Sequence, residues 1–390
     1  MRVTGRIFRG SRFGRSTTCC QKEGQKSRDD DAHERTWIFT ELHVLGLPNN
    51  IPSQTWARLA DVTLLLVGAG TGNQIMFGCS QRIRMRRKAI GMLVGITGAT
   101  GFMGMVHVAK LVKSSEFVRV LVRQGHPWAT RAPQGIDVVV GDLSDEAALE
   151  RFSTDLDVCF HYAARASFKG DWEQFRQVNV EGTRRLVRAC QDVSRFIFCS
   201  TQAVILEDRD ILDGDEGLPY PDTFADHYAR SKAEAEQLVL TEHNGATVLR
   251  PPWVWGAGDT NNLPTLLRPS MNGRIAYFAG GKNQLETVHA LNFIFGAEAC
   301  AASEKTKGKI YFVTDESPIL SGAFSNEILE ACGLEANTRS LPAALGRALA
   351  WSGKRDKRGN LILPRSSFLY MVRHQVLSDE TFRADTGYAS

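Results

Sequence analysis

A glycine-rich turn at residues 98–104 constrains the fold of this chain more than any other part of its sequence. An apolar run at residues 92–97 leads into glycines spaced Gly-x-x-Gly-x-x-Gly, and an apolar helical pattern follows at once. This order predicts a buried strand, a tight turn and a helix N-terminus. Glycine lets the backbone reverse and lie against a pyrophosphate, while the free N–H groups of the helix attract its charge. The residues expected at this dinucleotide site are Gly98, Thr100, Gly101, Phe102, Met103 and Gly104.

Strand-like and helix-like segments alternate downstream of the first strand. The strand-like runs are Met92–Thr97, Phe117–Val122, Asp137–Gly141, Val158–Tyr162, Arg195–Ser200 and Thr247–Arg250. The helix-like segments are Phe102–Val112, Glu146–Phe152, Trp172–Cys190 and Phe224–Glu242. Apolar strands that alternate with helices imply a parallel sheet covered on both faces. We therefore predict an α/β protein with a doubly wound parallel sheet, a Rossmann fold, that binds ligands at the carboxyl ends of its strands.

The pattern of predicted strands and helices divides the chain into three parts. Residues 91–255 carry the regular strand and helix pattern and are expected to form the dinucleotide-binding domain. Residues 256–390 contain mixed short elements and are expected to form a smaller substrate-binding region. One strand near residues 309–314 is predicted to return to the sheet. Residues 1–90 look unlike the rest, with a basic start and an irregular middle.

The first ninety residues have three interpretations: a poorly ordered extension, an organelle transit peptide, or a start codon assigned too early. The extension and the early start are favoured, because Met92 stands at the natural beginning of the first strand. Within this part, residues 62–72 form an apolar run followed by glycines, a pattern similar to a strand and a glycine turn. They lack the third spaced glycine and a good amphipathic helix, so we expect no nucleotide there.

Composition excludes several functions for this chain of 390 residues and formal net charge +4. The basic excess lies largely in the N-terminal part, so it predicts no nucleic-acid partner. The eight cysteines are scattered without a Cys-x-x-Cys pair or a Cys/His cluster, which predicts no metal site and fits a reducing cytoplasm. No apolar run is long enough to span a membrane, although peripheral membrane contact and a homodimer are both compatible with the sequence.

The residues that end the next strands indicate how the cofactor is held. Arg123 follows the second strand, where an acidic residue would bind a ribose diol, and its guanidinium suits a 2′-phosphate. This favours NADP, with NAD as the alternative and a solvated arginine as the non-functional interpretation. Asp142 and Leu143 follow the third strand and are expected beside the adenine, unless Asp142 caps a helix. Ala163 and Ala164 follow the fourth strand, where small side chains admit a flat cofactor.

Tyr228 and Lys232 form the strongest chemical signal, because a spacing of four places both on one face of a helix. A phenol has an ordinary pKa of about 10, and a nearby ammonium would lower it toward the range of a useful base. The tyrosine would then exchange a proton with an alcohol or ketone while hydride moves to or from a nicotinamide. Ser200 and Thr201 end the fifth strand and offer hydroxyls to the same oxygen. His161 is expected to be structural, since nothing nearby provides a partner.

With these features in this order, the sequence resembles the extended short-chain dehydrogenase/reductase superfamily from Met92 almost to its end. Three further segments are similar to motifs of that superfamily: Asn179–Thr183, Leu249–Asp259 and Val288–Asn292. Four others resemble the 3β-hydroxysteroid dehydrogenase family within the epimerase/dehydratase branch: Leu218–Pro221, Tyr311–Pro318, Ser340–Pro342 and Phe382–Tyr388.

The resemblance implies a role for each matching residue. Thr201 matches the catalytic Ser/Thr, Tyr228 the general acid/base and Lys232 the residue that lowers its pKa. Asn179 matches the helix asparagine that supports a proton-relay water, and Pro251 belongs to a cofactor-contacting segment. Two departures stand out: threonine replaces the commoner serine, and the glycine that usually follows Val204 by one or two positions is missing.

The expected reaction is interconversion of a secondary alcohol and a ketone on a small, steroid-like or otherwise bulky apolar substrate. Trp253, Trp255 and Phe278 are candidates to line its pocket, with core packing as the alternative. The same catalytic group serves nucleotide-sugar epimerases and dehydratases and dihydroflavonol-type reductases, so these remain rival functions. An NADPH-sensing regulator is the non-enzymatic rival.

Overall fold

The computed structural model describes residues 91–114, 116–273, 275–315, 317–356 and 361–389. The predictions made for residues 1–90, including the glycine turn at 62–72, lie outside the described residues.

A sheet of seven parallel strands forms the centre of the described chain, in the order β12-β7-β5-β4-β1-β2-β3. These strands are β1 (Leu93–Thr97), β2 (Phe117–Val122), β3 (Ile136–Val140), β4 (Val158–His161), β5 (Arg195–Cys199), β7 (Ala246–Arg250) and β12 (Lys309–Phe312). The strand order reverses between β1 and β4, which is the switch point where open α/β sheets bind ligands. The predicted doubly wound fold is confirmed, with strand ends that differ by one or two residues.

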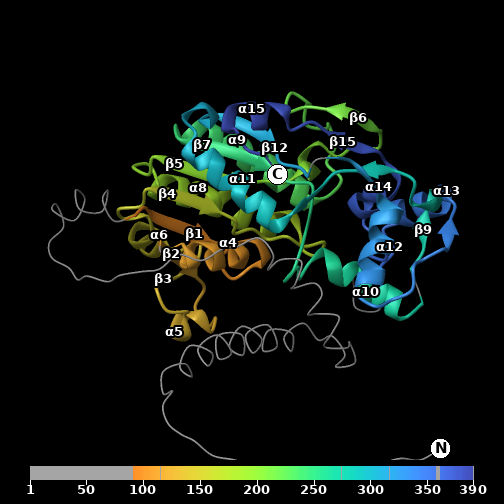
Figure 1. The fold of residues 1–390 in the computed structure, drawn as a ribbon, viewed down its shortest axis with the longest axis horizontal. Helices are drawn as coiled ribbons and strands as arrows, with labels where there is room; N and C mark the ends of the chain where they lie inside the picture. The colour runs from red at the N-terminus through yellow and green to blue at the C-terminus, as the bar shows by residue number, and fades with distance from the viewer. Residues whose placement is uncertain (1–90, 115, 274, 316, 357–360, 390) are drawn as a thin grey trace, which may run out of the picture. The chain divides into compact units, whose positions relative to one another are not determined.

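Helices cover both faces of this sheet, because alternate strand residues point to opposite sides (Figure 1). The helices α4 (Phe102–Lys113) and α11 (Ala290–Ala302) pack on one face, and α6 (Glu146–Ser153), α8 (Gly182–Ala189) and α9 (His227–Glu242) pack on the other. Val94 and Val120 belong to the first core, while their neighbours Leu93 and Leu121 belong to the second.

The remaining elements complete the described chain. They are α5 (Trp128–Arg131), α7 (Trp172–Phe175), η2 (Arg176–Glu181), η3 (Gln202–Ile205), β6 (Ile211–Gly214), β8 (Trp253–Trp255), α10 (Asn262–Met271), β9 (Tyr277–Phe278), η4 (Ala279–Gly281), β10 (Gln284–Leu285), β11 (Thr287–His289), η5 (Glu304–Thr306), β13 (Ile319–Leu320), α12 (Ser321–Ala331), β14 (Ser340–Leu341), α13 (Ala343–Trp351), α14 (Arg365–Val372), β15 (Gln375–Leu377) and α15 (Glu380–Thr386).

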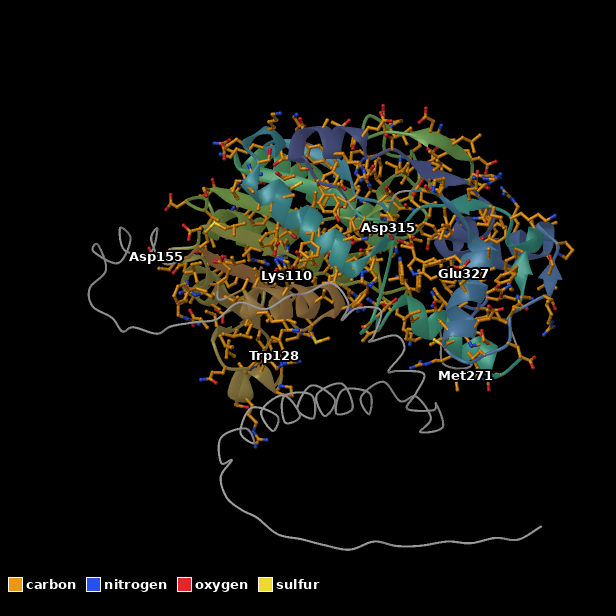
Figure 2. The ribbon with its side chains drawn as sticks, viewed as in Figure 1. Lys110, Trp128, Asp155, Met271, Asp315 and Glu327 are labelled. Atoms are coloured by element: carbon orange, nitrogen blue, oxygen red, sulfur yellow. The ribbon has the colours of Figure 1, made fainter. Side chains whose placement is uncertain are left out.

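Strand pairing crosses the boundary that the sequence suggests near residue 255. The early strand β6 joins a second sheet in the order β13-β10-β15-β6, whose other strands come from the C-terminal part. Conversely, β12 returns to the central sheet beside β7, as expected for residues 309–314. The C-terminal part therefore contributes α11, β12 and α15 to the sheet domain. Its other helices form a group of their own, in which Figure 2 places Met271 of α10 and Glu327 of α12.

Two predicted helices differ from the structure for local reasons. The predicted helix Trp172–Cys190 is interrupted by η2, a π-helical segment that connects α7 to α8. The predicted helix Phe224–Glu242 begins only at His227, because the Asp226 side chain accepts a hydrogen bond from the Ala229 N–H at 2.8 Å and caps it.

Candidate active site

The glycine turn packs so closely that two of its positions admit no side chain. Gly98 has φ +71°, and a Cβ there would lie 2.5 Å from the backbone nitrogen of Ala163. A Cβ on Gly104 would lie 2.2 Å from the carbonyl oxygen of Gly98. Gly101 closes the turn by donating its N–H to the Gly98 carbonyl at 2.9 Å. The turn therefore holds the start of α4 against the ends of β1 and β4.

The first turn of α4 is arranged to receive an anion. Gly101 stands at its N-cap without a side-chain cap, and no acidic residue lies in the first turn. Its N–H groups and the positive end of the helix dipole are therefore suited to a phosphate. Thr100, Gly101 and Met103 keep exposed surface, while the Phe102 side chain is buried in the core. A pyrophosphate thus fits the backbone of this turn.

The ends of β2 and β3 bring Arg123 close to Asp142. Both side chains are exposed, and the Arg123 charge lowers the pKa of Asp142, although hydrogen bonds from Ser144 are the larger cause. The Asp142 carboxylate accepts hydrogen bonds from the Ser144 N–H at 2.8 Å and hydroxyl at 2.6 Å. The helix cap that was the alternative for Asp142 is supplied instead by Asp145, which accepts from the Ala148 N–H. Leu143 is buried against Gly182 of α8.

The end of β4 lies against the glycine turn. The Ala163 N–H donates to the Thr97 hydroxyl at 3.4 Å, which joins the ends of β4 and β1. Ala163 and Ala164 are both half-buried, and the Ala163 backbone lies against Gly98.

His161 is buried and structural, as expected, but the expectation that it lacks partners was wrong. Its Nδ1 shares a hydrogen bond of 2.6 Å with the Thr97 hydroxyl, and its Nε2 shares one of 2.9 Å with the Thr183 hydroxyl. Both partners are distant in the sequence, so only the fold brings them together. Burial lowers the pKa of His161 well below its ordinary value, which favours the neutral ring.

Asn179 lies inside the π-helical segment η2, with its side chain buried. Its Oδ1 accepts from the Arg165 N–H at 2.7 Å, and its Nδ2 donates to the Ser231 hydroxyl at 2.8 Å. The Ser231 hydroxyl in turn donates to the Tyr228 carbonyl at 2.8 Å. Asn179 therefore connects η2 to the first turn of α9. The water that the resemblance assigns to it stays a prediction.

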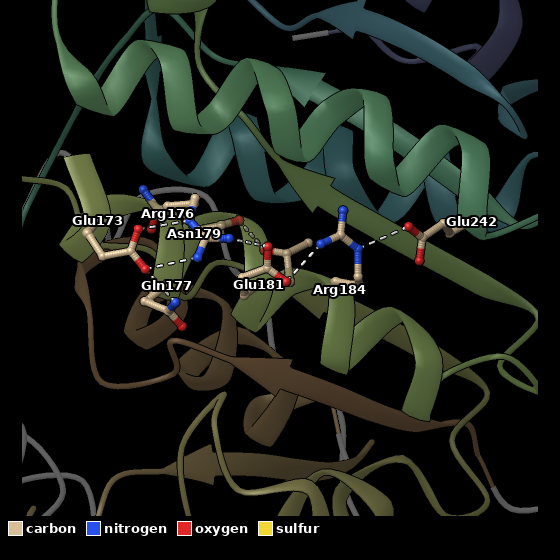
Figure 3. Close-up of polar contacts among 8 residues, drawn as sticks. Glu173, Arg176, Gln177, Asn179, Glu181, Arg184 and Glu242 are labelled. Carbon is tan, nitrogen blue, oxygen red and sulfur yellow. Dashed lines mark hydrogen bonds and ion pairs between the residues drawn. The ribbon is translucent and has the colours of Figure 1, made fainter.

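A row of ion pairs runs along the outside of the same segment (Figure 3). Glu181 binds Arg176 at 2.7 Å across the π turn and Arg184 at 2.7 Å within α8. Glu173 binds Arg176, and Glu242 of α9 binds Arg184 at 3.2 Å. All these side chains keep some exposed surface, so each pair contributes little alone. Together they hold the π turn that carries Asn179, since the Arg176–Glu181 pair has the five-residue spacing of a π-helix.

Tyr228 is the second residue of α9, and its side chain lies beside that of Thr201. Thr201 follows β5 and caps η3 by accepting from the Ala203 N–H at 3.2 Å. Burial raises the pKa of Tyr228 above its ordinary value, while the neighbouring Thr201 hydroxyl acts in the opposite direction. The expected lowering of this pKa by Lys232 was therefore wrong for the protein alone, because burial outweighs the favourable contacts.

Lys232 lies one helical turn beyond Tyr228 and is almost fully buried. Its ammonium donates to the Cys199 carbonyl at 2.7 Å and lies 3.9 Å from the centroid of the Phe198 ring. Burial lowers the pKa of Lys232 to about 8, and the nearby Glu236 carboxylate acts in the opposite direction. The lysine is thus held against the end of β5, the strand that presents Thr201.

A buried ion pair on the same helix face was missed by the sequence analysis. Glu236 lies one turn beyond Lys232 and accepts from the Arg250 guanidinium at 2.8 Å and from the Tyr220 hydroxyl at 2.7 Å. Both members of the pair are buried. The signal was present, since Glu236 continues the four-residue spacing of Tyr228 and Lys232, but its partner at the end of β7 is set by the fold.

Several buried polar atoms beyond the ends of β5 and β7 have no hydrogen-bond partner in the described chain. These atoms are the hydroxyl of Ser200, Oε1 of Gln202 and Nε1 of Trp253. The Pro251 carbonyl, just after β7, accepts from the Gln202 N–H at 3.0 Å. Buried polar groups without partners are costly, so these strand ends are suited to a polar ligand.

A cleft with a volume of about 580 Å³ lies against the first turn of α9. This volume is in the range that accommodates a small organic molecule. Its lining includes Phe168, Phe175, Phe224, Asp226, Arg230 and Trp351. The three aromatic residues proposed from the sequence lie elsewhere. Phe278 is buried against Phe368, and Trp253 and Trp255 both pack edge-on against Phe324, because strand pairing directs these side chains into the C-terminal packing.

Within the described ranges, no group of three or more His, Cys, Asp or Glu side chains is placed to hold a metal ion. None of the helices there combines the length and the apolar character needed to cross a bilayer.

The fold and the glycine turn are those of an extended short-chain dehydrogenase/reductase, an NAD(P)-dependent oxidoreductase. A family model agrees: residues 95–343 match the 3-beta hydroxysteroid dehydrogenase/isomerase family. The chain belongs to this family.

Two curated relatives support this membership. A 4-hydroxy-2-methyl-3-oxo-4-farnesyl-3,4-dihydroquinoline-1-oxide ketoreductase from Stigmatella aurantiaca is 32% identical over 305 residues, which cover 75% of this chain and 91% of the relative. A 3-beta-hydroxysteroid dehydrogenase from Mycolicibacterium neoaurum is 32% identical over 256 residues, which cover 61% of this chain and 69% of the relative.

A solved structure extends the likeness of fold. A dTDP-glucose 4,6-dehydratase from Streptomyces venezuelae, with NAD bound, has a TM-score of 0.58 at 21% identity. The match covers 76% of this chain and 91% of that one.

Proposed function

We propose that this protein is an NADP(H)-preferring oxidoreductase that interconverts a ketone and a secondary alcohol, with Tyr228 as the general acid/base. The observation that carries the proposal is the placement of the Tyr228 side chain beside Thr201, with Lys232 one turn away on the same helix and held against the end of β5. This group lies at the carboxyl end of β5, on the side of the sheet where β1 meets the glycine turn. Such placement suits proton transfer beside a bound dinucleotide.

Each residue of the group has a proposed task in the reduction. Thr201 donates a hydrogen bond to the ketone oxygen, and Tyr228 gives that oxygen its phenolic proton as the negative charge develops there. Lys232 stabilises the phenolate that remains, and Asn179 fixes the first turn of α9 through Ser231. The cofactor supplies the hydride that reduces the carbonyl carbon. In the oxidation, proton and hydride travel in the opposite directions.

The cofactor contacts are proposed on the geometry of the strand ends. Gly98, Gly101 and Gly104 provide the pyrophosphate cradle, with Thr100 and Met103 at its accessible rim. The exposed Arg123 guanidinium would bind a 2′-phosphate, which favours NADP over NAD. The other proposed contacts are Phe102 through its backbone, Asp142, Leu143, Ala163, Ala164, Tyr228, Lys232 and Pro251.

The proposed substrate is a bulky, largely apolar ketone or alcohol, of which a steroid is one example. The cleft at the start of α9 supports this, because it combines several aromatic side chains with a few charged groups. The names of the two relatives, one acting on a farnesylated quinoline oxide and the other on a hydroxysteroid, point the same way. Nucleotide-sugar chemistry is the alternative that the dehydratase of similar fold represents.

The test measures the change in nicotinamide absorbance when the protein is incubated with the cofactor and one candidate substrate at a time. The candidates are sterols, steroids, prenylated quinolones, flavanonols and nucleotide sugars. The Tyr228→Phe variant should bind NADPH as the wild type does and lose turnover about 100-fold or more, because it lacks the transferable proton. Tyr277→Phe is the matched control, since it removes a hydroxyl that binds Asn326 at 2.6 Å in the C-terminal part.

Near-normal turnover by Tyr228→Phe would remove Tyr228 from this role. Turnover confined to nucleotide sugars, followed as product formation because an epimerase or dehydratase leaves no net change in its cofactor, would replace the proposed substrate class. Tight NADPH binding with no turnover of any compound would favour a cofactor-sensing regulator.

A further inference from the structure

The segment formed by β14, α13 and α14 exposes an unusual number of large apolar side chains. We call residues 341–356 and 361–371 the α13–α14 surface. Its exposed members, with their exposed fractions, are Leu341 (36%), Leu345 (56%), Trp351 (38%), Ile362 (51%) and Met371 (41%). Single exposed apolar residues are ordinary, but a group of them from one short segment indicates an interaction site.

The helix α13 has small residues on its buried face and apolar residues on its exposed face. Its inner side is small and buried: a Cβ on Gly346 would lie 2.6 Å from the Phe368 ring, and Ala350 is 4% exposed. Its outer side carries Ala344, Leu345 and Ala348, which share one face at helical spacing and are exposed. The helix thus presents apolar groups outward although its own inner face is already covered.

The charges of the α13–α14 surface are almost all positive. Its described residues include four basic side chains and a single acid: Arg347, Lys354, Arg355, Arg365 and Asp356. The guanidinium groups of Arg347 and Arg365 lie 4.6 Å and 5.2 Å from the centroid of the Trp351 ring. Arg347 also forms an ion pair with Asp208. A tryptophan between cations, beside exposed leucines, is the composition of a helix that lies in a lipid headgroup layer.

We propose that the α13–α14 surface binds the surface of an anionic lipid bilayer. The positive charges favour an anionic partner, and the exposed leucines favour one with an accessible apolar layer. A second copy of this surface is disfavoured, because like charges would face one another. With nine residues, α13 is too short to span a bilayer and suits a position parallel to it.

The surface borders the cleft at the start of α9, since Trp351 and Arg365 belong to both. Bilayer contact would place the cleft mouth at the headgroup layer, where an apolar substrate could enter without crossing water. This last step rests on the proposed function, whereas the lipid binding does not.

The experiment is flotation of the full-length protein with vesicles of 70% phosphatidylcholine and 30% phosphatidylglycerol, without cofactor or substrate. The wild type should bind these vesicles, and binding should fall with pure phosphatidylcholine or in 0.5 M NaCl. Leu345→Glu should weaken binding about tenfold or more, because it removes an apolar contact and adds a repelled charge. Leu212→Glu is the matched control, since Leu212 is 63% exposed on β6, outside this surface, and should bind as the wild type does.

Turnover of a short, water-soluble ketone by Leu345→Glu should remain unchanged, because this leucine does not line the cleft. The proposal is overturned if the wild type fails to bind anionic vesicles, or if Leu345→Glu and Leu212→Glu bind equally. It is also overturned if Leu345→Glu changes the oligomeric state in size-exclusion chromatography, since the surface would then be a protein interface. Because binding is measured without turnover, its failure is distinct from failure of the proposed reaction.

Discussion

Single residues at the strand ends set what the dinucleotide site accepts, and Arg123 is the one that can be tested most directly. It is exposed at the end of β2, and its charge acts on the Asp142 carboxylate. A guanidinium at this point attracts a 2′-phosphate, whereas a carboxylate there would accept hydrogen bonds from the ribose diol and repel the phosphate.

Arg123→Asp is therefore expected to move the ratio of kcat/KM for NADPH over NADH toward NADH by about 100-fold, the sum of a lost attraction and a new repulsion. Arg131→Asp is the matched control, because Arg131 is exposed at the end of α5 and should leave the ratio unchanged. An equal ratio in the two variants would mean that Arg123 only faces solvent.

The residues that the sequence could identify are those whose chemistry is local. The glycine spacing and the Tyr228–Lys232 spacing each depend on one turn of backbone, so both were visible without the fold. The partners of His161 and Glu236 were not visible, because Thr183 and Arg250 reach them through the stacking of helices on the sheet. The pKa of Tyr228 was misjudged for the same reason, since burial depends on the elements packed above it.

Among the elements, α9 concentrates the proposed chemistry on one face, with Tyr228, Lys232 and Glu236 four residues apart. This arrangement has an energetic cost that can be measured. Lys232 has a pKa of about 8 in the folded protein, against 10.5 for an unburied lysine. Between these two values the unfolded chain binds more protons, so the free energy of unfolding should rise with pH.

The Lys232→Met variant lacks this titrating group, so it is the reference against which the pH dependence of the wild type is measured. Between pH 7.5 and 9.5, the unfolding free energy of the wild type should gain about 2 kcal/mol relative to the variant, as measured by urea denaturation. Below pH 7.5 the difference should be constant, because the lysine is then charged in both states. Lys169→Met, at an exposed loop position, should show no such change. A parallel pH dependence of wild type and Lys232→Met would contradict the burial of a charged lysine.

The sequence predicted the elements of the central sheet far better than those of the C-terminal part. Buried parallel strands such as β1 and β5 are apolar over most of their length and lead into glycine or hydroxyl residues, so their pattern is strong. The strands β9, β10 and β13 have only two residues each, which is too short for a period to show. The π-helical segment η2 was also hidden, because its residues continue an ordinary helical pattern and differ only in hydrogen bonding.

For the whole molecule, the last helix decides whether the chain behaves as one cooperative unit. Phe382 of α15 is fully buried in the core shared by α4, α11 and the central sheet, where it meets the Tyr311 and Tyr388 rings at 6.0 Å and 5.4 Å. Asp385, one turn later, binds the Tyr311 hydroxyl at 2.6 Å and the Lys309 ammonium at 2.7 Å. The final residues thus cover β12, the edge strand that the C-terminal part returns to the sheet.

Phe382→Ala should therefore lower the free energy of unfolding by about 3–5 kcal/mol, as expected for a large aromatic side chain removed from a packed core. Phe295→Ala is the matched control on α11, because Phe295 is 44% exposed and should cost about 1 kcal/mol or less. Denaturation followed both by circular dichroism and by displacement of bound NADPH should give coincident transitions, since the helix packs on the domain that holds the glycine turn. Early loss of the C-terminal part without loss of NADPH would show instead that α15 is dispensable to the sheet.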